Sequence, residues 1–419
     1  MREMKDSGIS WVGEIPKEWK IMPLYCFYSE RKNKNIFGAE NNLLSLSYGK
    51  VIRKDINTSE GLLPSNYNGY NIVEAGDIII RPTDLQNDKR SLRTGLSKER
   101  GIITSAYIAL KPKNGINSRF YHYLLHTYDI LKVFYNMGNG VRQGLNYDEF
   151  AKLMVYSPSD TEQQRIAEFL DRECGKIDGL KADIQAQIDT LEQYKRSVIT
   201  EAVTHGLNPS APMKDSGAGW MPLIPLHWKA DKLKFHLRQR GIKNQIDKQV
   251  LSLYREYGIV PKDSRDDNHN VTSEDVSDYR YVRVGDFVVN KMKAWQGSVA
   301  VSNYEGIVSP AYFVYEFSDD LINKRYFHYL MRNKTYATEF RRLSGGIREG
   351  QWDLPSEALN NTIILLPPLD EQQEIADYLD NKCAEIEQII ADKKTQIETL
   401  DGYKKSLIYE YVTGKKEVV

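Results

Sequence analysis

Two long segments of the chain carry apolar residues at the spacing of one face of an α-helix. From residue 160, and again from residue 369, apolar positions recur mostly at intervals of three and four without an interior proline. A period kept over so many turns predicts two long amphipathic helices with a coiled-coil-like seam. The recurring apolar residues are Ile166, Phe169, Ile177, Leu180, Ile184, Ile188, Leu191, Tyr194 and Val198 in the first segment, and Ile375, Leu379, Cys383, Ile386, Ile390, Ile397, Leu400, Tyr403 and Leu407 in the second.

Residues that begin and end helices flank both segments. A Thr or Asp followed three residues later by Gln fits a capping box, and a glycine stands where each helix would stop. Neither segment is apolar all round, so each helix needs a partner for its apolar stripe. The signals are Thr161, Gln164 and Gly206 for the first segment, and Asp370, Gln373 and Gly414 for the second.

The two segments belong to an internal repeat. Residues 4–20 and 213–229 are identical at 10 of 17 positions with an offset of 209, and residues 158–204 and 367–413 are identical at 23 of 47. A period of this size is that of a domain. The chain therefore contains two copies of one module, and their pseudo-twofold relation favours antiparallel helices. By the same relation, we expect the chain near Thr413 to lie close to the N-terminal MKDSG segment.

Between the repeated parts, two stretches differ in sequence but share signals. Strand-like runs follow matched glycines, from Asp77 to Ile80 and from Asp286 to Val289, and helix patterns cover residues 119–135 and 324–340. We expect an α+β fold, with two pseudo-twofold-related α/β domains separated by an antiparallel pair of long coiled-coil helices. The expected limits are 1–157 for the first domain, 158–212 for the first long helix and linker, 213–366 for the second domain, and 367–419 for the second long helix and tail.

Bulk composition is that of a globular protein, with 41% hydrophobic and 27% charged residues among 419. No apolar run reaches membrane-spanning length, the first residues lack a signal-peptide core, and three cysteines do not form a disulfide framework. We expect a cytoplasmic protein with no membrane partner.

The formal net charge of zero hides an uneven distribution. Residues 21–157 carry 18 basic and 12 acidic side chains, and residues 230–366 carry 20 and 18. The repeated segments are acidic, with 6 basic and 10 acidic side chains in residues 158–205 and 5 and 11 in residues 367–413. A polyanion would meet the variable parts, although the second is only weakly basic.

Motifs of common catalytic machinery are missing. The chain has no Asn-Pro-Pro-Tyr or Asp-Pro-Pro-Tyr motif of an amino-methyltransferase, no glycine-rich cofactor loop between a strand and a helix, and no Walker A pattern. Asp/Glu-x-Lys combinations occur as they do by chance, so a nuclease carboxylate cluster stays open. We expect a non-catalytic protein without a bound cofactor or metal.

The layout resembles the DNA-specificity subunit of type I restriction–modification systems. The resemblance rests on the two variable parts, the two matching helices, the opening MKDSGxxWxGxIPxxW, and the Glu-Gln-Gln-x-Ile-Ala start of each helix at Glu162 to Ala167 and Glu371 to Ala376. It covers nearly the whole chain. The second copy departs from the opening motif where Met221-Pro222-Leu223 replaces Val12-Gly13-Glu14.

The resemblance implies a division of labour. Each target-recognition domain would read half of a split double-stranded DNA site, and the antiparallel helices would set the spacing. Methyltransferase subunits would dock on the helices and a restriction/translocase subunit would join the assembly. S-adenosylmethionine, ATP and Mg would then belong to the partner subunits.

Direct readout needs Arg, Lys, Asn or Gln on loops that reach base edges. The first candidates follow matched strands in the two domains, with a solvated surface loop as the alternative. They are Arg81, Thr83, Gln86, Asn87, Lys89, Arg90 and Arg93 in the first domain, and Asn290, Lys291, Lys293, Trp295 and Gln296 in the second.

Two further pairs of segments are candidates for DNA contact. The glycine-rich segments GNGVRQGLNYD and SGGIREGQWDL share a Gly-x-Arg-x-Gly spacing, where glycine allows close approach to a phosphate or only a turn. The segments LSYGKVIRKD and LYREYGIVPKD read equally as plain hairpins. Their candidates are Arg142, Gln143, Asn146, Arg348, Gln351 and Trp352 in the first pair, and Tyr48, Lys50, Arg255 and Tyr257 in the second.

Other repeated residues have structural interpretations. His122 and His328 occupy matched places on apolar helix patterns and are expected to pack in the core. Four tryptophans recur and are interpreted as anchors against the helix ends: Trp11, Trp19, Trp220 and Trp228. The polar starts of the helices are either solvated or a docking surface for a partner protein. The resemblance favours docking through Glu162, Gln163, Gln164, Glu371, Gln372 and Gln373.

The sequence supports two functions of different classes. The first is a non-catalytic DNA reader of a non-palindromic bipartite site, because two variable parts of different sequence are joined to matching repeated parts. The alternative is a coiled-coil scaffold that binds proteins through its two globular domains. Salt dependence separates them, since phosphate contacts release counterions and give a steep negative slope.

Overall fold

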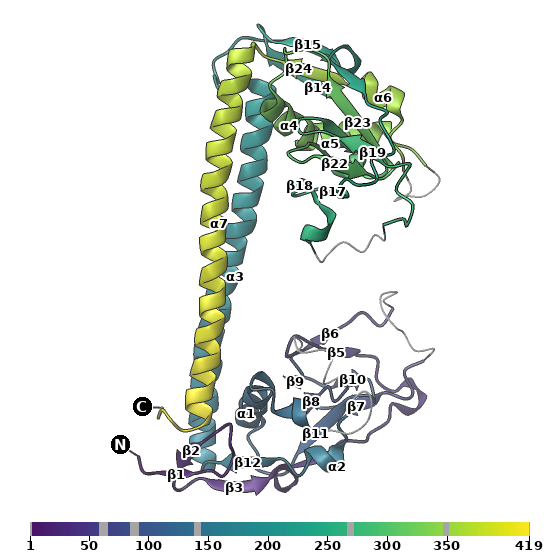
Figure 1. Ribbon diagram of the computed structural model, residues 1–419. Helices are drawn as coiled ribbons and strands as arrows, with labels where there is room; N and C mark the ends of the chain where they lie inside the picture. The colour runs from purple at the N-terminus through teal and green to yellow at the C-terminus, as the bar shows by residue number, and fades with distance from the viewer. Residues whose placement is uncertain are drawn as a thin grey trace. The chain divides into compact units, whose positions relative to one another are not determined.

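The computed structural model describes residues 2–57, 66–83, 92–137, 144–265, 272–346 and 352–418. The chain forms two compact units. Unit 1 comprises Met1–Ile184 and Lys394–Val419, and unit 2 comprises Gln185–Lys393. Each unit contains one variable domain and a stretch of both long helices (Figure 1).

A four-stranded antiparallel sheet forms the centre of unit 1, in the order β4, β11, β8, β9. Strand β8 consists of three isoleucines, of which Ile78 and Ile80 join the main core with helix α1, while Ile79 joins a second cluster on the other face. Successive side chains of a strand point to opposite faces, so both faces of this sheet are covered. The sheet strands are β4 (Tyr28–Glu30), β8 (Ile78–Ile80), β9 (Thr94–Leu96) and β11 (Ile108–Pro112).

Shorter antiparallel pairs complete unit 1. The pairs are β1 (Met4–Asp6) with β2 (Glu14–Pro16), β3 (Lys20–Pro23) with β12 (Met154–Ser157), β5 (Leu44–Ser47) with β6 (Lys50–Arg53), and β7 (Asn71–Val73) with β10 (Gly101–Ile103). The helices are α1 (Ser118–Ile130) and α2 (Tyr147–Phe150), with the 3-10 turns η1 (Leu24–Cys26), η2 (Ile36–Gly38) and η3 (Val133–Asn136).

Unit 2 repeats this topology around the sheet order β16, β23, β20, β21. These strands are β16 (Leu237–Gln239), β20 (Phe287–Asn290), β21 (Val299–Val301) and β23 (Tyr312–Phe317). The pairs are β13 (Met213–Ala218) with β14 (Met221–Pro225), β15 (Lys229–Lys232) with β24 (Ile363–Leu366), β17 (Leu251–Tyr254) with β18 (Gly258–Pro261), and β19 (Arg280–Val282) with β22 (Gly306–Val308). The helices are α4 (Lys324–Arg332), α5 (Lys334–Leu343) and α6 (Ser356–Asn360), with η4 (Leu233–Phe235), η5 (Lys262–Ser264) and η6 (Ala294–Gln296).

The single helix predicted for residues 324–340 is wrong. Asn333 has extended backbone angles, and its side chain accepts hydrogen bonds from the amides of Thr335 and Tyr336, so it caps a new helix, α5. Asparagine competes for local backbone groups in this way, which ends α4 after nine residues. In unit 1 the matching pattern also ends early, because α1 stops at Ile130 and a left-handed Lys132 precedes η3.

The two long helices are α3 (Asp160–His205) and α7 (Leu369–Val412). Gly206 and Gly414 follow them with φ of 77° and 69°, as left-handed C-terminal caps require. The predicted capping boxes are wrong. The Oγ atom of Ser159, one residue before α3, accepts from the amide of Glu162 at 3.4 Å, and Gln164 and Gln373 bond elsewhere.

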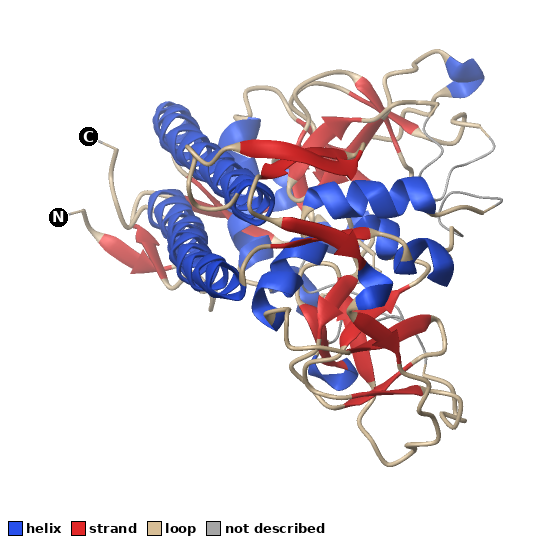
Figure 2. Ribbon diagram, turned by 90° about the horizontal axis from the view of Figure 1, so that it is seen from above, coloured by secondary structure: helices blue, strands red, loops and turns tan. Residues whose placement is uncertain are grey.

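Antiparallel packing of the helices is confirmed within each unit, where the two run side by side (Figures 1 and 2). In unit 1, the Nζ atom of Lys404 donates to Asp178 at 2.6 Å, and the rings of Phe169 and Tyr411 lie 4.3 Å apart. In unit 2, Lys195 pairs with Glu387. These two residues are the repeat equivalents of Lys404 and Asp178, so the two ion pairs obey the pseudo-twofold relation.

The chain ends meet within unit 1, as predicted. Gly414 packs against Pro16 and Trp19, so closely that a Cβ atom there would lie 2.9 Å from the tryptophan ring. The hydroxyl of Tyr409 donates to the carbonyl of Val12 at 3.4 Å. The last turn of α7 therefore packs on the strand pair β1–β2.

Three features bear on chemistry. No helix in the described ranges is both long enough and apolar enough to cross a lipid bilayer. Among the same residues, no cluster of three or more His, Cys, Asp and Glu side chains is arranged to hold a metal ion. The thiols of Cys26, Cys174 and Cys383 are free.

Candidate nucleic-acid interface

The β5–β6 hairpin presents one aromatic side chain in unit 1. Its turn consists of Tyr48 and Gly49, with φ of 45° and 78°, both left-handed as a two-residue type I′ turn requires. Tyr48 is 85% exposed. Lys50, the next residue, is also exposed, and its Nζ atom lies 3.8 Å from Asp178 of α3. A rigid turn therefore carries a ring and a cation that both face solvent.

The β17–β18 hairpin does the same in unit 2 with a longer turn. Arg255, Glu256 and Tyr257 form the turn, and Gly258 follows with φ of 72°. Tyr257 is 58% exposed and is the repeat equivalent of Tyr48, at the same offset of 209. The guanidinium carbon of Arg265 lies 4.1 Å from the centre of the Tyr257 ring, which is a cation–π contact.

The loop after β8 gives a mixed outcome. Arg93 was predicted to contact DNA, but it is fully buried, and its Nη1 atom donates to the carbonyl of Thr83 at 2.6 Å and to that of Arg81 at 3.4 Å. The prediction for Arg93 is therefore wrong, because its guanidinium is buried and binds backbone carbonyls of the protein itself. Arg81 and Thr83 stay predictions. Four candidates lie outside the described residues: Gln86, Asn87, Lys89 and Arg90.

The matching segment in unit 2, at the end of β20 and in the loop after it, contains a second correction. Asn290 is only 8% exposed, and its side-chain oxygen accepts from the amide of Met292 at 3.1 Å, so it stabilises the turn and does not reach DNA. Lys291 pairs with Asp353 at 3.4 Å. Lys293 and Gln296 are exposed and stay predictions for DNA contact.

An aromatic cluster brings this loop close to the glycine-rich segment of unit 2. The rings of Trp295 and Trp352 lie 5.6 Å apart, and the guanidinium of Arg341 lies 5.9 and 5.7 Å from their centres. Both tryptophans are partly exposed. The structure thus joins two candidates that are 57 positions apart in the chain.

The remaining candidates of the glycine-rich segments are mostly outside the described residues. In unit 1, Asn146 is exposed and caps α2, where its side chain accepts from the amide of Glu149 at 2.9 Å. That bond gives Asn146 a structural role, and its contact with DNA stays a prediction. The residues outside the described ranges are Arg142, Gln143, Arg348 and Gln351.

The matched histidines pack inside their domains, as predicted. Burial lowers the pKa of His122 to about 4 and that of His328 to about 4. The Nδ1 atom of His328 accepts from the amide of Val301 at 3.3 Å. Burial, reinforced by the nearby His122, also lowers the pKa of His126 to about 3. These imidazoles are neutral at pH 7 and serve packing.

The Glu-Gln-Gln start of α3 joins the helix to its own domain. The carboxylate of Glu162 accepts from the indole Nε1 of Trp19 at 3.0 Å and from the guanidinium of Arg2 at 2.5 and 3.0 Å. Gln163 is 1% exposed and donates to the carbonyl of Pro158 at 3.0 Å. Docking of a partner on Glu162 and Gln163 was predicted, and it is wrong because these groups are used internally.

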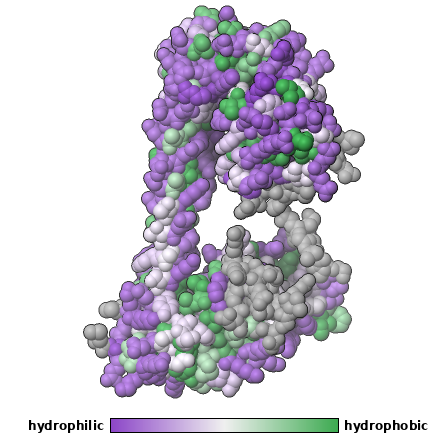
Figure 3. Space-filling model, in the orientation of Figure 1, coloured by the Kyte–Doolittle hydropathy of each residue, from purple (hydrophilic) through white to green (hydrophobic). Residues whose placement is uncertain are grey.

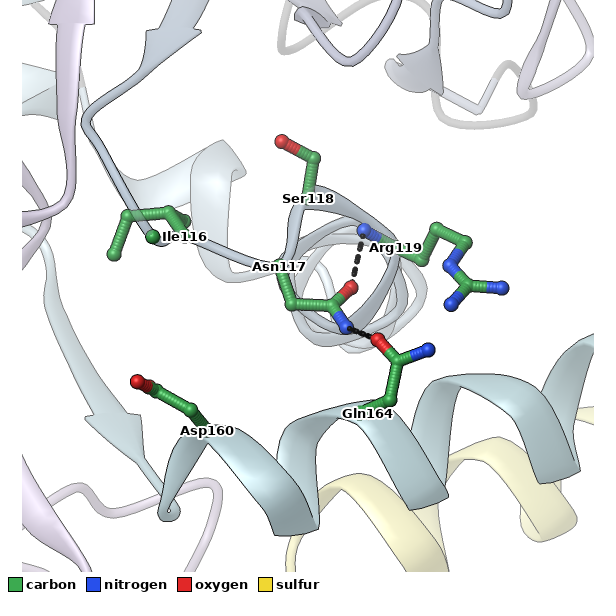
Figure 4. A pocket seen from close by; sticks show the side chains of 7 residues that line it. Ile116, Asn117, Ser118, Arg119, Asp160 and Gln164 are labelled. Carbon is green, nitrogen blue, oxygen red and sulfur yellow. Dashed lines mark hydrogen bonds between the residues drawn. The ribbon is translucent and has the colours of Figure 1, made fainter.

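Figure 4 shows the outer edge of this joint, a shallow depression between the starts of α1 and α3. The Nδ2 atom of Asn117 donates to the Oε1 atom of Gln164 at 2.8 Å, while its Oδ1 atom caps α1 through the amide of Arg119 at 3.1 Å. One asparagine therefore ties the ends of two helices together. Gln164 is exposed, so its contact with a partner stays a prediction.

Unit 2 repeats the joint. Glu371 accepts from Nε1 of Trp228 at 3.0 Å and bonds His227 at 2.7 Å. Gln372 is 1% exposed and donates to the carbonyls of Leu321 and Pro367. The docking prediction is wrong for Glu371 and Gln372 and stays a prediction for the exposed Gln373, which accepts from Asn323.

The anchor role of the tryptophans holds for two of the four. Trp19 and Trp228 are buried against the helix starts. Trp11 instead packs edge-on against Tyr128 of α1, and Trp220 against Tyr336 of α5. The predicted anchoring of Trp11 and Trp220 to the helix ends is corrected, since they pack on domain helices.

Sequence reasoning missed three cations near the exposed aromatic residues. They are Arg265, Arg332 and Arg341. Arg332 carried a usable signal, because a charged residue directly after Leu330 and Met331, which pack in the core, must find acceptors. The visible face of unit 2 is mainly hydrophilic with scattered apolar residues, which suits a polar partner (Figure 3).

Comparison with known proteins identifies the family. The model of the type I restriction modification DNA specificity domain matches residues 27–190 and 242–399. The type I restriction enzyme MjaVIII specificity subunit of Methanocaldococcus jannaschii is 26% identical over 344 residues, which cover 76% of this chain and 75% of that protein. The putative MjaX specificity subunit of the same organism is 22% identical over 431 residues, covering 97% and 96%.

A solved structure shares the fold. A chain from work on complex assembly and conformational transition of the type I R-M system aligns with a TM-score of 0.66 at 13% identity, over 96% of this chain and 99% of that one. The expected fold of two recognition domains and long helices is thereby confirmed. The chain belongs to the type I restriction modification DNA specificity domain family, and its function is that of a DNA-recognising specificity subunit.

Proposed function

We propose that each recognition domain reads one half of an asymmetric bipartite DNA site, and that the chain itself performs no chemistry. One observation carries the proposal. The hairpin tips at Tyr48 and Tyr257 are repeat equivalents on the same scaffold, but the residues around them differ: Leu46, Ser47 and Lys50 in unit 1 are replaced by Arg255, Glu256 and Ile259 in unit 2. Equal placement supports equal function, and unequal side chains support different bases.

Methylome sequencing of a host that carries the system tests this proposal. The expected motif has two dissimilar halves separated by unread bases. A chimera in which residues 230–366 replace residues 21–157 sharpens the test, because two copies of one domain related by a pseudo-twofold should read an inverted repeat. A continuous palindrome for the native protein, or an unchanged motif for the chimera, would contradict the proposal.

We further propose that α3 and α7 set the length of the unread spacer, as the family resemblance implies. Support comes from the continuous helices of 46 and 44 residues. Inserting seven residues into each helix, at the level where Lys393 contacts Gln187, keeps the apolar seam in phase. Each helix gains about 10 Å, so the spacer should lengthen by about 3 base pairs while both half-sites stay unchanged.

The helices also support docking of two methyltransferase subunits. Unit 1 exposes Leu180 and Tyr403 at 53% and 56%, and unit 2 exposes their repeat equivalents Ile389 and Tyr194 at 45% and 49%. Equivalent apolar pairs suit equivalent copies of one partner. Tyr403→Asp and Tyr194→Asp should each remove one methyltransferase subunit from the complex, measured by native mass spectrometry.

The partners supply the chemistry in this proposal. S-adenosylmethionine would be bound by the methyltransferase subunits, and ATP and Mg by a restriction/translocase subunit, all in the cytoplasm. The alternative of a protein-binding scaffold is tested by titrating the assembled complex with DNA at several salt concentrations. Specific binding with a steep negative slope of affinity against salt supports the reader, whereas salt-insensitive association with protein alone supports the scaffold.

A further inference from the structure

Arg332, the last residue of α4, bonds the turn of the β17–β18 hairpin in unit 2. Its Nη2 atom donates to the carbonyls of Arg255 and Glu256 at 2.7 and 3.0 Å, and its Nη1 atom donates to the carbonyl of Val299 at 3.3 Å. The first two acceptors belong to the turn, and the third belongs to strand β21 of the central sheet. One planar guanidinium therefore ties the turn to the core of the domain.

These contacts lack a carboxylate. Arg332 is half-buried and burial lowers its pKa, and no carboxylate in the described part of the chain forms an ion pair with it. A partly desolvated cation is costly unless its donors are satisfied, and here the acceptors are backbone carbonyls. Backbone carbonyls have fixed positions, so the arginine fixes the turn and not a mobile side chain.

The close approach is built into the hairpin. Gly258 has φ of 72°, and a Cβ atom at this position would lie 3.1 Å from Nη1 of Arg332 and 3.7 Å from the ring of His328. The glycine at position 258 allows the backbone of the turn to approach the guanidinium this closely. Tyr257 directly precedes this glycine, so the backbone that presents its ring is held on both sides, by Glu256 and by Gly258.

The shorter turn of unit 1 does not need an arginine like Arg332. There the turn is the two-residue Tyr48–Gly49, whose backbone is fixed by its own type I′ geometry. The helix position that matches Arg332 is His126, whose ring lies 3.6 Å from where a Cβ atom of Gly49 would be. The three-residue turn of unit 2 has more backbone freedom than the two-residue turn of unit 1. The side chain of Arg332, which is longer than that of His126, restricts this freedom.

We infer that Arg332 is a positioning residue for DNA recognition, which holds the β17–β18 turn so that Tyr257 meets its half-site in one fixed pose. The inference rests on the proposed function of this hairpin. Lysine at this position keeps the charge but carries all its donors on one nitrogen in place of the planar fork, so it can no longer bridge the turn and strand β21.

The test uses the full chain assembled with its methyltransferase subunits. The probes are three DNA duplexes: one with the site defined by methylome sequencing, and one each with the first or the second half-site scrambled. Arg332→Lys should lower discrimination at the half-site read by unit 2 by roughly tenfold and leave the other half-site unchanged. Tyr257→Ala should do the same, and the double variant should lose no more than either single one, because both changes remove one unit of recognition.

Controls separate positioning from folding. Arg238→Lys makes the same exchange at an arginine of unit 2 that is 78% exposed and pairs with Glu316, and it should change neither half-site. Hydrogen exchange in the Arg332→Lys complex should speed up at the amides of the 255–258 turn while the strands β20 and β23 stay protected. If Arg332→Lys does not fold, Arg332→His, which installs the residue of unit 1, gives the same readouts.

Four outcomes are decisive. Additive losses in the double variant, or full discrimination by Arg332→Lys alongside a loss in Tyr257→Ala, would overturn the positioning role while leaving the proposed function intact. Full discrimination by both single variants would overturn the role of the hairpin. Absence of any half-site discrimination by the native complex would instead refute the proposed function.

Discussion

The joint between helix and domain is built twice, and the two versions differ in one of the side chains that bind the start of the helix. In both, a buried tryptophan donates its indole N–H to the first glutamate of the Glu-Gln-Gln motif, at 3.0 Å. In unit 1 the second partner of the glutamate is the guanidinium of Arg2, whereas in unit 2 it is the imidazole of His227, which lies sixteen positions later in its repeat frame. The repeat therefore preserves the acceptor and the indole ring and lets different parts of the chain supply the second partner. Matching elements should respond differently to matching mutations, and the following predictions use that difference.

The largest difference is expected at the buried ion pairs beside β8 and β20. Asp77 is fully buried and bonds Arg31, and Asp286 is 4% exposed and bonds Arg240 at 3.1 and 3.2 Å. Each aspartate also accepts one backbone amide at 2.8 Å. Arg240 has a second carboxylate, Glu316, at 2.7 Å. Removing Asp286 therefore leaves Arg240 partly neutralised.

Asp77→Ala should lower the free energy of unfolding of unit 1 by about 3–5 kcal/mol, since it strands a buried guanidinium. Asp286→Ala should cost unit 2 about half as much, because Glu316 remains. Native-state hydrogen exchange in strands β8 and β20 measures both. Equal losses would show that Glu316 does not compensate, and Glu316→Ala combined with Asp286→Ala should restore the full cost.

The next largest effect is a pH dependence found only in unit 1. Burial raises the pKa of Asp129 from 3.8 to about 6, against the opposing bond from the Arg93 amide. The matching residue in unit 2 is Thr335, which does not titrate. A carboxyl whose pKa is higher in the folded state stabilises that state most below pH 4, and this contribution is lost as pH rises through 6.

Asp129→Asn should remove this dependence. Relative to wild type, the variant should gain about 2 kcal/mol in the free energy of unfolding of unit 1 between pH 4 and pH 6.5. The slope is the readout, because the absolute value also contains the cost of the new amide. Unit 2 of the same molecule serves as the control. A pH-independent difference between variant and wild type would refute the raised pKa.

A smaller contrast is expected at the glycines that end the long helices. Both have positive φ, which costs an alanine about 1 kcal/mol. At Gly414 a methyl group would also collide with Pro16 and lie 2.9 Å from Trp19, whereas at Gly206 the nearest atoms, of Glu371 and Trp228, are 3.1 and 3.2 Å away.

Gly414→Ala should therefore destabilise unit 1 by about 3 kcal/mol, and Gly206→Ala should destabilise unit 2 by between about 1 and 2 kcal/mol. Thermal unfolding followed by hydrogen exchange in each unit measures the two. Similar losses would show that the backbone angle alone decides, and that the rigid proline and tryptophan do not resist the methyl group.

These contrasts also show what the sequence could predict. The long helices, their antiparallel packing and the meeting of the chain ends followed from periodicity and repetition, which depend on average burial over many residues. The break at Asn333 did not, because an asparagine within a helical pattern looks the same whether its side chain faces solvent or bonds the next amides. Local competition of that kind needs atomic geometry.

The candidate site was predicted where exposure is set by a turn and missed where it is set by tertiary contacts. Tyr48 and Tyr257 sit in hairpin turns, and the hairpins were readable from glycine positions and alternation. Arg93 and Asn290 stand at strand ends, where surface-loop residues also occur, and only the carbonyls and amides within reach show that they are internal. The Glu-Gln-Gln motif was interpreted as a docking surface for a related reason. Trp19, which binds Glu162 in the structure, lies 143 positions away in the chain.

The smallest predicted effect concerns Asp178 and its repeat equivalent Glu387. Asp178 of α3 pairs with Lys404 at 2.6 Å and also lies 3.8 Å from Lys50 of the recognition hairpin, whereas Glu387 pairs with Lys195. Both pairs are partly exposed, so Asp178→Asn and Glu387→Gln should each change stability by less than about 1 kcal/mol. Their effects on DNA binding should nevertheless differ. Among the described residues, Asp178 lies close to Lys50 of the β5–β6 hairpin, whereas Glu387 has no lysine or arginine of the β17–β18 hairpin as an ion-pair partner.

Asp178→Asn leaves the charge of Lys50 free for a phosphate, so DNA affinity should rise by about threefold at low salt and the gain should fade as salt screens the contact. Glu387→Gln should leave affinity unchanged under the same conditions. Lys50→Ala combined with Asp178→Asn separates the explanations. Persistence of the gain without Lys50 would mean that the acidic helix face repels DNA directly, whereas its loss would show that Asp178 acts by competing for the hairpin lysine.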